Sequence, residues 1–146
     1  MYTYSIKQIL KVVDGDTVDV SIDLGFDLTK KERVRLSGID TPESRTKDLA
    51  EKHMGLEAKA YLVELLKNAD DLIVKTEKDG KFGRMLGEFF SNKFTIYSIN
   101  QQLVDEGYAW EYDGGSKAKD LQVLIDKRSQ YVESSSISTR KDRNKC

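Results

Sequence analysis

The stretch that decides the fold is YSIKQILKVVDGDTVDVSIDL, residues 4–24. Apolar and polar residues alternate on both sides of a central Asp-Gly-Asp, and such alternation is typical of β-strands. An Asp-Gly pair between two alternating runs is a strong signal for a hairpin. The stretch therefore predicts two antiparallel strands, 4–13 and 17–24, joined by a tight turn.

The rest of the chain extends this hairpin into a small barrel. Alternating or apolar runs predict further strands at 31–39, 72–76 and 86–90. Apolar residues at helical spacing predict helices at 55–68, 98–106 and 117–131, with Ser98 capping the second helix and Gly107 ending it. We therefore expect an α+β fold, a five-stranded OB-type β-barrel with three peripheral α-helices. A barrel of this kind has a groove on one face that suits polyanions.

Length and composition indicate one small domain. The 146 residues fit a single barrel domain over 1–131, followed by a serine-rich and then basic tail, 132–146, that we expect to be disordered. Cys146 is the only cysteine, which excludes an intrachain disulfide. No apolar run approaches the ~20 residues needed to span a bilayer, and the N-terminus is typical of a strand rather than a signal peptide. We expect a cytoplasmic monomer without membrane contact, or a secreted or periplasmic one if a leader has been removed.

The charge balance permits nucleic-acid binding without pointing to it. The net charge is −1 and the sequence pI is about 5.9, whereas a basic face is the usual feature of phosphate-binding proteins. The charge is unevenly distributed, because 117–146 hold eight Lys and Arg against four Asp and Glu, a net of +4, which leaves 1–116 at −5. We expect part of this acidic portion to hold a metal ion.

Two motifs place acidic and basic residues around turns, VVDGDTVDV at 12–20 and RLSGIDTPE at 35–43. Structure alone can explain them as a hairpin turn and as a strand that breaks at a proline. A functional interpretation explains more of the residues. Two carboxylates and a backbone carbonyl would bind a hard cation, an arginine would contact a phosphate, and a further carboxylate would lie beside a water. The residues concerned are Asp16, Asp40, Thr41 (backbone carbonyl), Arg35 and Glu43.

A third motif, GKFGR at 80–84, is either a solvated charged loop or a second phosphate contact. Its glycines would let Arg84 approach a phosphate closely, and a planar guanidinium suits two-pronged contact with phosphate oxygens. Two aromatic residues further along, Trp110 and Tyr112, either stack on a base, a contact worth ~1–3 kcal/mol, or pack against the barrel. The single histidine, His53, argues against a histidine-rich zinc site and a Ser-His-Asp triad.

Taken in order, the motifs resemble the staphylococcal nuclease family. The resemblance covers about 12–112 and rests on three segments, DGDT at 14–17, RL leading into DTPE at 35–43, and KFGR at 81–84, with a helix between the second and the third. It implies the five-stranded OB barrel with three helices. It also implies that Ca²⁺ is held by the carboxylates of Asp16 and Asp40 and the backbone carbonyl of Thr41, with Asp14 in the outer shell.

The resemblance also implies a catalytic apparatus and a product. Arg35 and Arg84 match the two arginines that grip the scissile phosphate, and Glu43 matches the general base. The products would carry a 3′-phosphate and a 5′-hydroxyl. The residues expected to contact the nucleotide are Lys81, Phe82, Trp110 and Tyr112. Phe82 departs from the tyrosine that the family often has there, which keeps the ring but removes a hydroxyl that could bond to phosphate.

The sequence therefore favours a Ca²⁺-dependent nuclease that hydrolyses DNA and RNA with little sequence preference, single-stranded or denatured substrates being preferred. A catalytically inactive OB-fold module that binds nucleic acid or protein is the main alternative. Such a module has no need for two aspartates, two arginines and a glutamate together. A plain calcium-binding protein would explain the aspartates but not the arginines.

Overall fold

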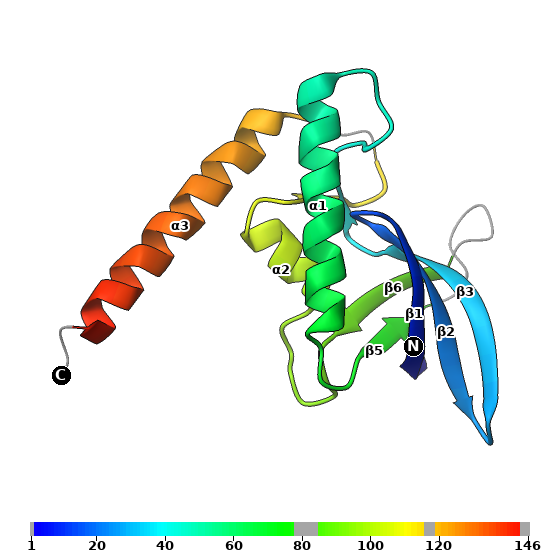
Figure 1. Cartoon of the computed structure of the whole chain (residues 1–146). Coiled ribbons are helices and arrows are strands. Elements are labelled where there is room, and N and C mark those ends of the chain that lie inside the picture. Colours follow the sequence, from blue (N-terminus) through cyan, green and yellow to red (C-terminus); the bar gives the residue numbers. More distant parts are fainter. Residues whose placement is uncertain (1, 78–84, 116–118, 144–146) are drawn as a thin grey trace.

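Five strands close into a barrel (Figure 1). The computed structural model describes residues 2–77, 85–115 and 119–143. The barrel order is β1-β2-β3-β6-β5, with every neighbouring pair antiparallel except β3 and β6, which run parallel. The strands are β1 (Tyr2–Asp14), β2 (Thr17–Gly25), β3 (Leu28–Leu36), β5 (Ile73–Thr76) and β6 (Met85–Phe90). The predicted five-stranded OB-type barrel with three helices is confirmed.

The barrel interior is filled by the apolar positions of the alternating runs. Val18 and Val20 of β2 and Val34 and Leu36 of β3 have almost no exposed surface. Stiff β-branched side chains suit such positions, because they pack well on a pleated surface. The intervening residues of these strands, including Arg35, point the other way, and this alternation directs the functional side chains out of the core.

The described part of the chain has three helices outside the barrel: α1 (Leu49–Lys67), α2 (Ile99–Asp105) and α3 (Leu121–Arg143). Figure 1 shows α1 lying along the barrel and α3 extending away from it. The second helix agrees with its predicted cap, because the Ser98 hydroxyl accepts from the Gln101 backbone N–H, and Gly107 follows the helix at φ +83°. None of the described helices is both apolar enough and long enough to span a membrane.

The first helix begins six residues before the predicted start at 55. The carboxylate of Asp48 accepts hydrogen bonds from the backbone N–H groups of Ala50 and Glu51, which caps the helix at Leu49. The prediction was wrong because Gly55 was taken as a helix boundary. In the structure Gly55 lies inside the helix, where the absence of a side chain permits a close contact described below.

The third helix continues beyond the predicted end at 131. Its backbone is helical to Arg143, whereas the sequence predicts a disordered tail from 132. The stretch 119–143 contains neither glycine nor proline, the two residues that most strongly end helices. Serine-rich and basic composition therefore did not by itself prevent helix formation.

A short second sheet joins the end of the barrel to the helices. The predicted strand 31–39 is divided at Gly38, whose φ is +75°, and the chain then forms β4 (Ile39–Asp40). This strand pairs with β7 (Trp110–Glu111), which puts Asp40 opposite Trp110. Trp110 packs in a separate apolar cluster with Met54 of α1 and Leu124 of α3. The pairing with Trp110 thus links Asp40 to the apolar cluster between α1 and α3.

Candidate active site

Most of the predicted catalytic and metal-binding residues line one small cleft. It lies where β1, β2, β3 and β4 meet, and it has a volume of about 210 Å³. Its lining residues are Asp14, Asp16, Thr17, Arg35, Asp40, Thr41, Pro42 and Glu43. The predicted residues Lys81, Phe82 and Arg84 fall outside the described part of the chain.

The turn between β1 and β2 places Asp16 against the loop that follows β4. A Cβ on Gly15 would lie 2.8 Å from the Cβ of Ala58 and 3.1 Å from Cγ2 of Thr41, so only glycine allows the turn to approach so closely. The backbone N–H of Thr41 donates to Oδ2 of Asp16 at 3.2 Å. The hydroxyl of Thr17 donates to Oδ1 of the same carboxylate at 3.1 Å. Asp16 is therefore held in one orientation.

Arg35 joins the two aspartates. Its Nη1 lies 3.2 Å from Oδ2 of Asp16, and its Nη2 lies 3.6 Å from Oδ1 of Asp40. The three side chains are only 13–16% exposed. Carboxylates from two separate strand ends thus meet around one guanidinium that is largely shielded from water, where electrostatic interactions are stronger than at an open surface.

The pKa of Asp40 is raised above its ordinary value. Burial is the main cause, and the neighbouring charge of Asp16 adds to it, while Lys119 and Arg35 act in the opposite direction. The two carboxylates therefore repel each other in a partly desolvated place. Additional positive charge near them would be favourable.

Glu43 has an anchored backbone and an accessible carboxylate. Its N–H donates to Oε1 of Glu51 at 3.3 Å, and its side chain is 58% exposed. Gly55 of α1 packs directly beneath it, because a Cβ there would lie 2.7 Å from the Glu43 carbonyl carbon and oxygen. Next to this loop the Ser44 hydroxyl donates to Oδ1 of Asp14 at 2.6 Å. The arrangement fixes the loop and leaves the Glu43 carboxylate at the mouth of the cleft.

Lys119 also reaches the cleft, and sequence reasoning missed it. Its Nζ lies 3.5 Å from Oδ2 of Asp40 and 3.4 Å from Oε1 of Glu43. Burial lowers the pKa of this ammonium, but the charges of Asp40 and Glu43 outweigh burial and raise it above the ordinary value. Nothing in the sequence distinguishes Lys119 from the nearby Lys117, because the contact depends on the folded path of the chain.

Of the two predicted stacking residues, Trp110 is placed in the interior. It is only 5% exposed, and its indole N–H donates to the backbone oxygen of Asp120 at 3.0 Å. A ring so buried has no free face for a base, which favours the alternative that Trp110 packs inside the fold. Tyr112 is half-buried and lines a groove of about 200 Å³ that also includes Arg35, Leu36 and Leu86.

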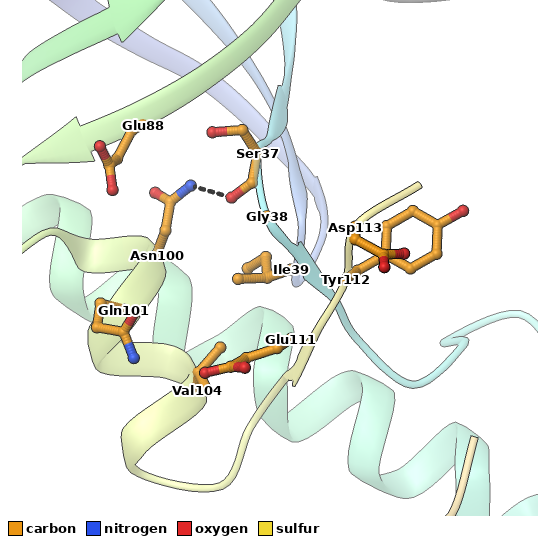
Figure 2. A pocket seen from close by; sticks show the side chains of 10 residues that line it. All are labelled: Ser37, Gly38, Ile39, Glu88, Asn100, Gln101, Val104, Glu111, Tyr112 and Asp113. Carbon is orange, nitrogen blue, oxygen red and sulfur yellow. Dashed lines mark hydrogen bonds between the residues drawn. The ribbon is translucent and has the colours of Figure 1, made fainter. Parts of the chain in front are cut away.

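A larger cavity has the wrong charge for a phosphate. It measures about 520 Å³ and contains Glu88, Glu111 and Asp113 but no basic residue. Figure 2 shows Glu88 beside Asn100, whose side-chain amide donates to the backbone oxygen of Ser37 at 2.9 Å. A phosphodiester would be repelled by these carboxylates. Size therefore does not identify the functional cleft here, whereas the charged groups of the smaller one do.

The smaller cleft has the donor chemistry that a hard cation requires. Its carboxylates and backbone oxygens are the ligands that Ca²⁺ prefers. Within 2–77, 85–115 and 119–143 no group of three or more His, Cys, Asp or Glu side chains could hold a metal ion. Two carboxylates and a carbonyl, the set expected from the sequence, would make a site with few protein ligands. The raised pKa of Asp40 fits a place that gains from a bound cation.

The comparisons with known proteins agree with the motif order. The family described as staphylococcal nuclease homologues matches residues 33–135. A micrococcal nuclease of Shigella flexneri is 30% identical over 122 residues, which cover 80% of this chain and 63% of that protein. A thermonuclease of Staphylococcus hyicus is 31% identical over 104 residues, covering 70% of this chain and 56% of that protein. An uncharacterised protein of Methanocaldococcus jannaschii is 30% identical over 145 residues, covering 84% and 67%. The chain thus spans about two thirds or less of the length of these relatives.

Proposed function

Because this chain belongs to the staphylococcal nuclease family, we propose that it is a Ca²⁺-dependent nuclease that hydrolyses phosphodiester bonds in DNA and RNA. The proposed products carry a 3′-phosphate and a 5′-hydroxyl, and denatured or single-stranded substrates are preferred. The observation that supports the proposal best is the meeting of Asp16 and Asp40 around the guanidinium of Arg35. A module that only bound nucleic acid would not need two shielded carboxylates beside its phosphate contact.

The chemistry of the reaction explains this arrangement. A phosphodiester is negatively charged, and further negative charge develops on its oxygens during nucleophilic attack. A guanidinium that is already oriented stabilises that charge, and losing a comparable donor typically slows an enzyme by about 10²–10³. Arg35 is oriented by its two aspartate contacts before substrate arrives, so it needs little rearrangement. From the family resemblance we propose Arg84 as the second such group.

Glu43 is proposed as the general base. Its carboxylate lies at the mouth of the cleft, 58% exposed, on a loop whose backbone is fixed by Glu51 and Gly55. This placement suits removal of a proton from a water that attacks the phosphorus. General-base catalysis of this kind contributes about 10²–10⁴ to the rate.

Asp16, Asp40 and the Thr41 carbonyl are proposed to hold Ca²⁺, with Asp14 in the outer shell. The ion, when bound, would neutralise charge on a non-bridging phosphate oxygen. So few protein ligands imply weak binding, towards the millimolar end of calcium sites. The two contacts that orient Asp16, from Thr17 and Thr41, leave the carboxylate in a fixed position for such a ligand role.

The groove between Arg35 and Tyr112 is proposed to receive the nucleotide next to the scissile phosphate. It contains apolar surface from Leu36 and Leu86 and the ring of Tyr112. Aromatic and aliphatic surfaces of this kind accept any base, because every base has a flat apolar face. Little sequence preference is the expected consequence.

A digestion assay tests the proposal. Purified protein is incubated with heat-denatured DNA and with RNA in millimolar Ca²⁺, with and without chelator, beside the Asp40→Asn variant. We expect cleavage by the wild type alone, abolished by chelation, and ends that carry 3′-phosphate. Intact nucleic acid in all reactions, with binding retained, would instead support the catalytically inactive OB-fold module.

A further inference from the structure

Among the residues that the structure describes, Lys119 is the one charged contact in the cleft that neither the motifs nor the family resemblance accounts for. Its ammonium touches two groups with different proposed tasks, Oδ2 of Asp40 at 3.5 Å and Oε1 of Glu43 at 3.4 Å. The side chain is 37% exposed, so part of it remains accessible from the solvent side of the cleft. A lysine in that position affects both the cation and the polyanion that the site is proposed to bind.

The path of the backbone delivers Lys119 to this position. Pairing of β4 with β7 sets Trp110 opposite Asp40. The indole N–H of Trp110 then holds the backbone oxygen of Asp120 at 3.0 Å. This bond brings Lys119, the residue before Asp120, close to Asp40. The contact is part of the architecture and does not rest on a freely rotating surface lysine alone.

The charges in the cleft explain what such a lysine does. Four carboxylates, those of Asp14, Asp16, Asp40 and Glu43, face two described cations, Arg35 and Lys119. Loss of one of the two cations would leave the cleft more attractive to Ca²⁺ and less attractive to a phosphodiester. An ammonium beside Asp40 therefore has opposite effects on the two ligands.

We propose that Lys119 weakens Ca²⁺ binding at Asp40 and in exchange strengthens the binding of nucleic acid. This inference rests on the proposed function, because it assumes that Asp40 is a cation ligand. A Ca²⁺ ion lies about 2.4 Å from its carboxylate oxygens. It would therefore sit within about 6 Å of the ammonium, given the 3.5 Å contact. Even at the dielectric constant of water, repulsion at that distance weakens binding about tenfold.

The test compares Lys119→Met with the wild type in two measurements. Isothermal titration with Ca²⁺, without nucleic acid, gives the Kd of the cation, and initial rates on denatured DNA in saturating Ca²⁺ give the KM. We expect the variant to bind Ca²⁺ about tenfold more tightly. Its KM is expected to rise about threefold, the size of a partly exposed ion-pair contact. Thermal unfolding without Ca²⁺ shows whether the variant is folded.

Two control variants separate charge from packing. Lys119→Arg keeps the positive charge, so its Kd for Ca²⁺ and its KM are expected to equal those of the wild type. Lys67→Met removes an exposed lysine at the far end of α1 and is expected to change neither constant. A purely structural role for Lys119 would instead change unfolding temperature and leave the two constants unaffected or worsen both together.

The outcomes distinguish failure of this inference from failure of the proposed function. An unchanged or weaker Ca²⁺ Kd in Lys119→Met, or an unchanged KM, overturns the role of Lys119 while the wild type still binds Ca²⁺ and cleaves DNA. A wild type that binds no Ca²⁺ in the titration overturns both, because no cation site then exists at Asp40 for Lys119 to oppose.

Discussion

The substitution Gly55→Ala tests how α1 positions the proposed general base. A Cβ at residue 55 would lie 2.7 Å from the carbonyl carbon and oxygen of Glu43 and from the carbonyl oxygen of Pro42. These distances are about 0.7 Å shorter than an ordinary contact of 3.4 Å. The obstructing atoms are backbone, so a rotamer change cannot relieve the clash. Either the helix or the loop that carries Glu43 must move.

Two effects on stability oppose each other, whereas the effect on catalysis has one direction. Alanine in place of glycine stabilises a helix interior by up to about 1 kcal/mol. Overpacking costs about 1–3 kcal/mol. We expect a net loss of up to about 2 kcal/mol, which lowers Tm by up to roughly 8 °C in a chain of this size. Displacement of a catalytic group by about 1 Å lowers turnover by as much as 10²-fold. We therefore expect kcat to fall by up to about 10²-fold, even if the free energy of unfolding changes little.

The assay measures thermal unfolding and kcat on denatured DNA in saturating Ca²⁺. Ala60→Gly is the matched control, because Ala60 lies exposed on the same helix and the change costs about 1 kcal/mol of helix propensity without approaching the cleft. We expect the control to lose stability and to keep its kcat within about twofold of the wild-type value. A Gly55→Ala protein with wild-type kcat and a raised Tm would refute the reasoning.

Three further substitutions address individual roles in the cleft. Glu43→Gln is expected to lower kcat by about 10²–10⁴ while Ca²⁺ binding persists in a titration; turnover near that of the wild type would remove the role of general base. Arg35→Lys keeps the charge but loses the two-pronged geometry, so single-turnover rates should fall by about 10²–10³, and a loss limited to KM would contradict that assignment. Trp110→Phe removes the hydrogen bond to Asp120 that positions Lys119. As for Lys119→Met, a calcium titration should show tighter binding, and KM should rise by no more than about threefold. A much larger rise in KM would instead restore Trp110 as a stacking residue.

The fold and much of the cleft could be predicted because their signals are local. The alternation around Asp14-Gly15-Asp16 defines the hairpin, and Pro42 marks the end of the next strand, so both aspartates were expected at strand ends. The barrel then brings these ends together, since Arg35 pairs with Thr17 across β2 and β3. Short-range patterns and one family resemblance were sufficient for this part.

The features that were missed depend on contacts between distant parts of the chain. Gly55 reads locally as a helix boundary, and only its contact with Glu43 explains why a glycine lies inside α1. Trp110 reads as a possible stacking residue until its indole is seen to bond to Asp120. Lys119 becomes part of the cleft through that same bond and cannot be recognised from its neighbours in the sequence.

A crystal structure of the protein soaked in tens of millimolar Ca²⁺ tests the central claim most directly. The account predicts an ion bonded to carboxylate oxygens of both Asp16 and Asp40 at about 2.3–2.6 Å, with the Thr41 carbonyl as a third protein ligand. Arg35 should remain beside it with a guanidinium free to meet a phosphate. An ion bound elsewhere, or aspartates that keep only their Arg35 and Lys119 contacts in saturating Ca²⁺, would contradict the account.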